Sequence, residues 1–177
     1  TADKTAFGSQ GSDLYGQYLY ITNNIQVDVF NVGAVAPVQT DSLDFVHGTP
    51  QAVVAHRDYL YIADTTGLLS VYDIRNPANP FLMKRFNPAP DGNARPGVAL
   101  SAADNYLYMV KDGSFDAGGQ LLVMDIGNPD APKTVGSVSL MRDDVNFTAY
   151  NMVVAGRYVY IGRDNSTANS GLVVVDV

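Results

Sequence analysis

The sequence predicts an all-β fold built from one repeated unit, and three observations lead to this prediction. An apolar run with the pattern Tyr-x-Tyr occurs four times, and the first tyrosines of successive copies are 41, 47 and 52 residues apart. A second apolar run follows each copy, at 27–32, 69–74, 121–126 and 172–177. All 18 acidic residues are aspartate, which favours turns, whereas glutamate, which favours helix interiors, is absent. The repeated segments are therefore predicted to be short strands joined by tight turns.

The unit is clearest in residues 58–80. Two β-rich runs, 59–62 and 69–72, are joined by an Asp-Thr-Thr-Gly turn at 64–67, so this stretch is predicted to form a hairpin. The proline-rich segment 76–80 ends the second strand, because proline donates no hydrogen bond to a sheet. Four strands are expected in this copy, at about 51–55, 59–63, 68–74 and 81–86. Four strands in roughly 40 to 45 residues are the spacing of a β-propeller blade.

Four blades are expected along the chain. Their approximate limits are 12–45, 51–87, 97–140 and 150–177, and the last blade lacks its outer strand. The aspartate that closes the third strand, such as Asp73, is expected to accept hydrogen bonds from the backbone of the turn that follows. The tyrosines of the Tyr-x-Tyr runs are expected to pack between blades rather than to form a carbohydrate-stacking platform.

Two arrangements remain open for the ends of the chain. In one, residues 1–11 supply the closing strand of a four-bladed ring. In the other, the chain is a fragment of a ring of six to eight blades. The sequence favours the second, because residues 2–7 make a poor strand and an open stack of blades leaves sheet faces uncovered.

Composition limits the partners and the location. The net charge is −7 and only four residues are lysine, so binding to nucleic acid is not expected. The chain has no cysteine, which excludes disulfides, thiolate metal sites and cysteine nucleophiles. No apolar run approaches the ~18 residues of a membrane-spanning helix. Low lysine, no glutamate and no cysteine together favour an exported protein, which would be secreted, periplasmic or on the cell surface.

The repeat resembles a known family. The segments Leu172-Val173-Val174-Val175-Asp176 and Leu121-Leu122-Val123-Met124-Asp125-Ile126 resemble the LVIVD-type repeat of bacterial and archaeal surface β-propellers. The first copy differs, because Asn31 stands where the other copies have aspartate, and residues 20–23 are similar to the related YVTN repeat. The resemblance covers about residues 12–177 and implies a propeller. It implies no single activity, because propellers of this kind have many unrelated functions.

A ligand site is predicted where loops from several blades converge at one end of the propeller. His47, Arg95 and Tyr150 precede or begin the inner strands of three blades, and His47 and Arg95 would hold an anionic or sugar-like group. Alternatively, His47 and Arg95 hydrogen-bond to carbonyls of neighbouring blades. No nucleophile, base and orienting group are recognisable together, so no catalytic residue is predicted.

A calcium site is a second candidate. The loop 112–119 is longer than its counterpart 64–67 and carries Asp112 and Asp116 beside several glycines. Such loops can bind calcium through oxygen ligands, although this one lacks the EF-hand pattern. The alternative is an ordinary surface loop without a metal.

These observations predict a noncatalytic binding or scaffold module. The loops at one end would face a protein or a surface glycan, and the chain would be part of a larger chain or assembly. Two alternatives remain: an enzyme or a metal- or cofactor-bearing propeller with its site at the mouth of the channel, and a structural component of a surface layer or filament.

Overall fold

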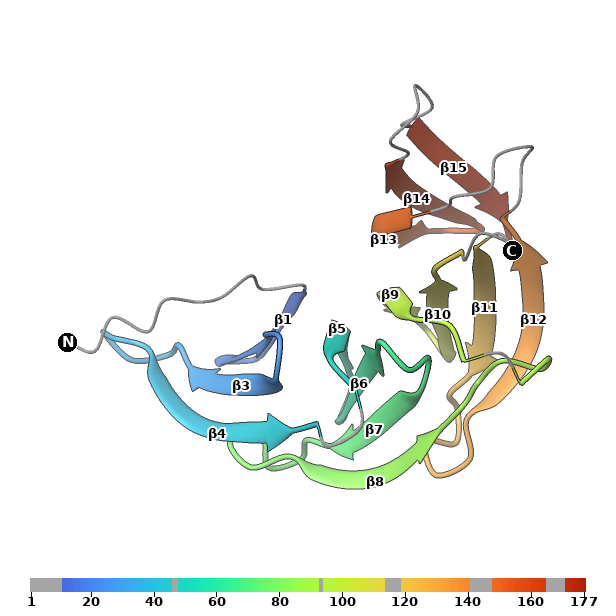
Figure 1. Cartoon of the computed structure of the whole chain (residues 1–177). Helices are drawn as coiled ribbons and strands as arrows, with labels where there is room; N and C mark the ends of the chain where they lie inside the picture. The colour runs from blue at the N-terminus through green and yellow to red at the C-terminus, as the bar shows by residue number, and fades with distance from the viewer. Residues whose placement is uncertain (1–10, 46–47, 93, 114–118, 141–147, 165–170) are drawn as a thin grey trace.

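The fold is all-β, as the repeats predict. The computed structural model describes residues 11–45, 48–92, 94–113, 119–140, 148–164 and 171–177. Within these residues the chain forms only strands, turns and irregular segments, and the strands make four antiparallel sheets arranged as a propeller (Figure 1). The described residues include no helix that is long and apolar enough to cross a membrane.

Each sheet is one blade, and its strands follow chain order from the inner strand outward (Figure 1). Blade 1 consists of β1 (Ser12–Tyr15), β2 (Tyr18–Thr22), β3 (Gln26–Asn31) and β4 (Val38–Asp44). Blade 2 consists of β5 (Pro50–His56), β6 (Tyr59–Asp64), β7 (Leu69–Asp73) and β8 (Phe81–Phe86). Blade 3 consists of β9 (Gly97–Ala103), β10 (Tyr106–Lys111), β11 (Gln120–Asp125) and β12 (Lys133–Ser139). Blade 4 has three strands, β13 (Thr148–Ala155), β14 (Tyr158–Asp164) and β15 (Gly171–Asp176).

The turn after the third strand has the predicted chemistry in three blades. The Oδ1 atom of Asp73 accepts from the backbone N–H of Arg75 at 2.9 Å, and that of Asp125 accepts from Gly127 at 2.8 Å. In blade 1 Asn31 does the same for the N–H of Gly33 at 2.9 Å. An asparagine therefore serves as well as an aspartate, because the bond needs only a side-chain oxygen two residues before the amide.

A bulge recurs at one position of the inner strands. In β5, β9 and β13 the register shifts by one residue near the start of the strand, which leaves Gln51, Val98 and Tyr150 without a direct partner on the neighbouring strand. A bulge bends its strand and increases the local twist. The sequence pattern gave no indication of it.

The blades pack face to face through the second tyrosine of each Tyr-x-Tyr run. Tyr20, Tyr61 and Tyr108 are buried between consecutive blades, whereas the first tyrosine of each run is half-buried or exposed. Tyr20 also donates its hydroxyl proton to the carbonyl of Pro77 in blade 2, at 3.1 Å. Packing between blades is therefore confirmed for these three second tyrosines.

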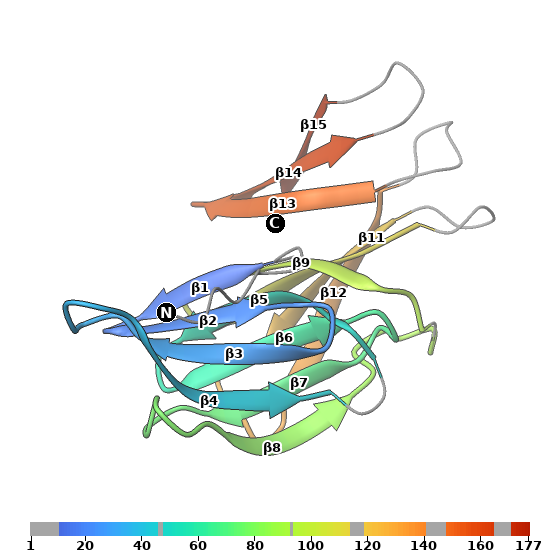
Figure 2. The same ribbon diagram turned by 60° about the vertical axis from the view of Figure 1, so that its left-hand side comes forward.

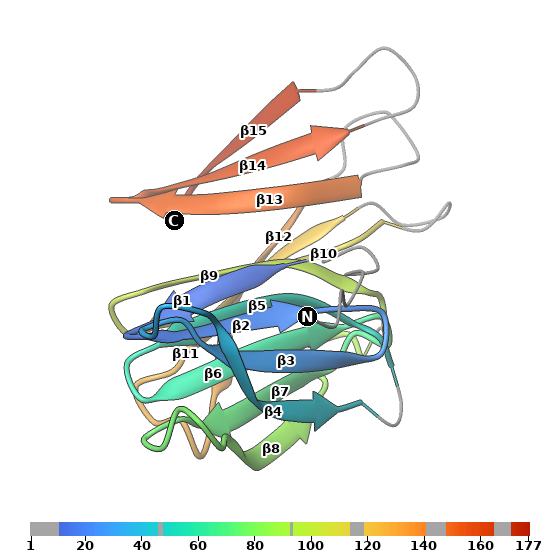
Figure 3. The same ribbon diagram turned by 90° about the vertical axis from the view of Figure 1, so that its left-hand side faces the viewer.

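The inner strands stand around a common centre. Contacts link β1 to β5, β5 to β9 and β9 to β13, while β13 and β1 have no comparable contact among the described residues (Figure 1). Blade 4 stands apart from blade 1 when the molecule is turned (Figure 2). In the view onto blade 1, no other blade lies in front of it (Figure 3).

Candidate functional site

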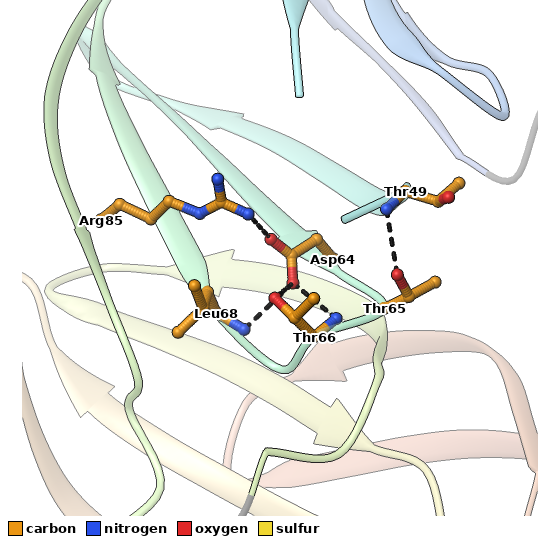
Figure 4. Close-up of polar contacts among 6 residues, drawn as sticks. All are labelled: Thr49, Asp64, Thr65, Thr66, Leu68 and Arg85. Atoms are coloured by element: carbon orange, nitrogen blue, oxygen red, sulfur yellow. Dashed lines mark hydrogen bonds and ion pairs between the residues drawn. The ribbon is translucent and has the colours of Figure 1, made fainter. Parts of the chain in front are cut away.

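The connection between β6 and β7 is organised by one buried carboxylate. Asp64, the last residue of β6, is fully buried. Its Oδ1 atom accepts from the backbone N–H of Thr66 at 2.8 Å, the Thr66 hydroxyl at 2.6 Å and the backbone N–H of Leu68 at 3.1 Å (Figure 4). Its Oδ2 atom forms an ion pair with the guanidinium of Arg85 on β8. Both oxygens are thus engaged, which is what a buried charge requires.

The same turn is fastened to the segment that leads into β5. The backbone N–H of Thr65 donates to the carbonyl of Thr49 at 2.9 Å, and the N–H of Thr49 donates to the Thr65 hydroxyl oxygen at 3.0 Å (Figure 4). The turn and the entry to the inner strand therefore form one rigid unit at this end of blade 2. Thr65 itself is exposed on its surface.

Gly67 brings the connection between blades 2 and 3 onto this turn. Its φ is +76°, in the left-handed region that favours glycine. A Cβ atom at this position would lie 2.8 Å from the backbone nitrogen of Arg95 and closer still to its carbonyl oxygen. The backbone of Arg95 is therefore held directly against the turn of blade 2. Its side chain is half-buried.

Lys111 supplies a buried ammonium group beside this turn. It is the last residue of β10, the position that Asp64 holds in β6, and its exposed fraction is 1%. Its Nζ atom lies 3.4 Å from the Oδ1 atom of Asn87, which follows β8. The pKa of Lys111 is lowered to about 8, mainly by burial and to a smaller extent by the charge of Arg95, while Asp91 and Asp64 oppose the change.

Five charged residues at the contact between blades 2 and 3 are therefore linked by electrostatic interactions, three of them to Lys111 and one, Arg85, to Asp64. We call them the seam cluster: Asp64, Arg85, Asp91, Arg95 and Lys111. Asp64 and Lys111 are buried, the side chain of Arg85 is 21% exposed, and Asp91 is exposed.

The structure places two of the three predicted ligand residues, Arg95 and Tyr150, in the segments of different blades. Arg95 belongs to the seam cluster. Tyr150 lies at the bulge of β13 in blade 4, with 67% of its surface exposed. His47 lies outside the described residues. The shared site at the channel mouth thus stays a prediction, and the seam cluster retains only Arg95 from it.

The calcium site also stays a prediction. Asp116 lies outside the described residues. Asp112 is half-buried, and its Oδ1 atom accepts from the backbone N–H of Gly113 at 2.9 Å. Burial raises the pKa of Asp112, and the bond from Gly113 opposes this. In the part of the chain that the structure describes, no three acidic or histidine side chains are grouped to hold a metal ion.

Asp64, Arg85 and Lys111 were not singled out from the sequence. Lys111 could have been found from the sequence. When the strands that begin at Tyr59 and Tyr106 are aligned, Lys111 occupies the same position as Asp64, at the end of an apolar strand. A charge at that position, in a strand with both faces covered, indicates a buried polar contact. Arg85 carried no such signal, because its strand is partly exposed throughout.

Solved structures share this fold at low sequence identity. The computationally designed Ika4 protein is 10% identical with a TM-score of 0.63, over 100% of this chain and 96% of that one. Glutaminyl cyclase from Myxococcus xanthus is 16% identical with a TM-score of 0.62, over 97% of this chain and 67% of that one. A putative 6-phosphogluconolactonase from Bacteroides fragilis is 16% identical with a TM-score of 0.69, over 94% of this chain and 52% of that one. At these identities the similarity shows the fold alone.

The chain spans 46% of the length of the computationally designed Ika8 protein, which is about half of that chain. No curated protein sequence matches it significantly. The LVIVD repeat family, in contrast, matches residues 47–88, 92–139 and 148–177. These segments contain blades 2, 3 and 4, with the second tyrosines and the aspartates that the resemblance rested on. The chain therefore belongs to the LVIVD repeat family and forms a β-propeller from its repeats.

Proposed function

We propose that this propeller is a noncatalytic binding or scaffold module, exported or displayed on a cell surface, and that the seam cluster is where it holds its partner. The observation that carries the proposal is the convergence of Arg85, Arg95 and Lys111 beside one rigid turn. Propellers commonly serve as interaction platforms, and their loops carry specificity on a fixed scaffold. The partner would be a protein or a glycan.

The charges favour an anionic group on that partner. Asp64 is already engaged by Arg85 and by its own turn, so its charge is compensated within the protein. Arg95 and Lys111 add two positive groups beside it and Asp91 adds one negative group, so the seam cluster as a whole has a net charge of one positive unit when Lys111 is protonated. A carboxylate of an acidic glycan or of an acidic peptide segment is the group that a half-buried guanidinium binds best, through paired hydrogen bonds.

Binding of simple polyanions tests the proposal. Polygalacturonate and poly-L-glutamate are titrated into the protein in a calorimeter, with neutral dextran as the uncharged comparison. The wild type is expected to bind at least one polyanion and not dextran, and Arg95→Ala is expected to weaken that binding about tenfold, or ~1.4 kcal/mol. Arg157→Ala is the matched control, because Arg157 is paired with Asp176 on the exposed surface of blade 4.

The variants are also checked for folding. Arg95→Ala should keep the circular dichroism spectrum of the wild type and a cooperative melt. Binding that is the same in the wild type and in Arg95→Ala would remove the seam cluster from the function. Loss of the fold in Arg95→Ala would show that Arg95 acts by fixing the contact between blades, which is the alternative that the sequence left open.

A further inference from the structure

Blade 4 presents an uncovered apolar row. Val153, Tyr160 and Val174 are direct neighbours across β13, β14 and β15 by strand register. Val153 is 58% exposed and Val174 is 50% exposed, and Leu172 beside them is 63% exposed. The opposite face of the same sheet is buried against blade 3 through Met152, Val159 and Ile161. One face of blade 4 is therefore packed and the other is not.

The equivalent row is buried in the other blades. In blade 2 the register aligns Tyr61 with Val71, and their exposed fractions are 1% and 0%. In blade 1 it aligns Tyr20 with Val29, and both are 0% exposed. Each row is covered by the next blade, which contributes a leucine and an apolar residue two positions later: Leu60 and Ile62 against blade 1, and Leu107 and Met109 against blade 2.

Blade 1 carries that covering pattern on its own free face. Leu19 and Ile21 occupy on β2 the positions of Leu60 and Ile62 on β6, and both are only half-buried. Leu14, on the same face of β1, is 57% exposed. Figure 3 looks onto this face and shows no blade in front of it. The stack of four blades thus has a free covering face on blade 1 at one end and an uncovered apolar face on blade 4 at the other.

We propose that two copies of this chain associate, and that blade 1 of each copy covers the free face of blade 4 of the other copy. A second copy is the expected partner because the contact between its blade 1 and blade 4 would repeat the apolar residue types and the register of the three existing contacts between blades. Two such contacts related by a two-fold axis close a ring of two chains, which leaves no exposed interface to propagate. The size agrees, because one chain spans 46% of the designed Ika8 protein at a TM-score of 0.64, so two copies would match the length of that single chain.

The existing contact between blades 1 and 2 predicts which residues should meet. Asp13 of β1 accepts from the backbone N–H of Ala55 of β5 at 2.7 Å. By register Val153 is the equivalent of Asp13, because each pairs with the second tyrosine of its blade. Leu14 is likewise the equivalent of Ala55, because they pair with Leu19 and Leu60. Val153 of one copy should therefore lie beside Leu14 of the other.

The chain has no cysteine, so this contact can be trapped with engineered ones. Leu14→Cys and Val153→Cys are made separately in the 177-residue chain, mixed and oxidised. The proposal predicts that the mixture forms a disulfide-linked pair with one subunit of each variant, whereas neither variant alone forms this link efficiently. It also predicts that light scattering gives the unsubstituted protein twice the mass of the chain at micromolar concentration.

The doubly substituted chain separates the other occupants. A linked dimer supports the proposal, and a monomer with an internal disulfide overturns it in favour of blade 1 closing on blade 4 of the same chain. A monomeric wild type with no cross-linking also overturns it, and leaves the face to a partner other than this chain. Val174→Asp is expected to weaken the dimer at least tenfold while keeping its circular dichroism spectrum, and Val135→Asp, on the outer strand β12, is expected to leave it unchanged.

Discussion

Two ion pairs in blade 2 lie in different surroundings, and the surroundings decide their strength. Arg85 pairs with Asp64, and Arg75 pairs with Asp73. The exposed fractions of the arginine and aspartate side chains are 21% and 0% in the first pair and 72% and 14% in the second. Water screens and competes with the second pair and not with the first. The two ion pairs are therefore expected to contribute unequally to the free energy of unfolding.

Arg85→Ala is expected to lower the free energy of unfolding by about 3 kcal/mol, because it leaves a buried carboxylate without its charged partner. Arg75→Ala is the matched control and is expected to change it by less than about 1 kcal/mol. Urea denaturation followed by circular dichroism measures both. A similar loss in the two variants would mean that Asp64 does not depend on Arg85.

Lys111 predicts a dependence of stability on pH. Burial lowers its pKa from 10.5 to about 8, so between these values the unfolded chain binds more protons at this lysine than the folded chain does. The cost of burying the charge is present in full below pH 8, and the free energy of unfolding rises as pH increases through this interval. Lys111→Met should remove that rise.

Urea denaturation at pH 7 and pH 10 measures this effect. The free energy of unfolding of Lys111→Met is expected to exceed that of the wild type most at pH 7, and this difference is expected to be smaller at pH 10. Lys133→Met, at the exposed start of β12, controls for the loss of a positive charge. A difference in the free energy of unfolding between Lys111→Met and the wild type that does not change with pH would show that Lys111 is not buried as a charged group.

Among the elements, those with strong local chemistry were predictable from the sequence. The four strands of blade 2 were expected at about 51–55, 59–63, 68–74 and 81–86, and they are found at Pro50–His56, Tyr59–Asp64, Leu69–Asp73 and Phe81–Phe86. Apolar periodicity and proline set those limits. The bulge at Gln51 was not predictable, because it depends on how an inner strand meets its neighbour and leaves no residue signature.

The candidate site likewise has one part that could be predicted from the sequence and one part that could not. The place of Arg95 beside the turn of blade 2 was predictable, since its position before an inner strand follows from the repeat, while its role as a ligand residue stays a prediction. Asp64 and Arg85 come from β6 and β8 of blade 2, whereas Lys111 comes from β10 of blade 3, so the approach of Lys111 to Asp64 is a product of packing between blades. Sequence spacing cannot express a contact between strands of separate sheets.

Gly67 tests whether the turn of blade 2 is held against the next blade. Gly67→Ala is expected to cost about 3 kcal/mol or more, because it adds a clash with the backbone of Arg95 to the strain of a positive φ. Gly16→Ala is the matched control: its φ is +61°, but a Cβ atom there would have no neighbour within 4 Å. It should cost about 1 kcal/mol. Urea denaturation measures both, and equal costs would place the Arg95 backbone away from the turn.

At the scale of the whole molecule, stability depends on contacts between blades as well as on the sheets themselves. A sheet of this propeller is apolar on two faces, and each face is covered only when another blade lies against it. Each of the three contacts between blades is formed by apolar residues at corresponding positions of the second strand, and the free faces at the two ends carry the same positions. The proposed binding through the seam cluster and the proposed association through the end faces both depend on this arrangement.

The most direct test compares one residue at two equivalent places, in protein dilute enough to be monomeric. Tyr61 and Tyr160 are the second tyrosines of blades 2 and 4; the first is 1% exposed and packs on blade 3, while the second lies on the uncovered face. The propeller predicts that Tyr61→Ala lowers the free energy of unfolding by about 3 to 5 kcal/mol and Tyr160→Ala by about 1 kcal/mol. Equal losses at the two positions would contradict the stacking of blades on which the whole account depends.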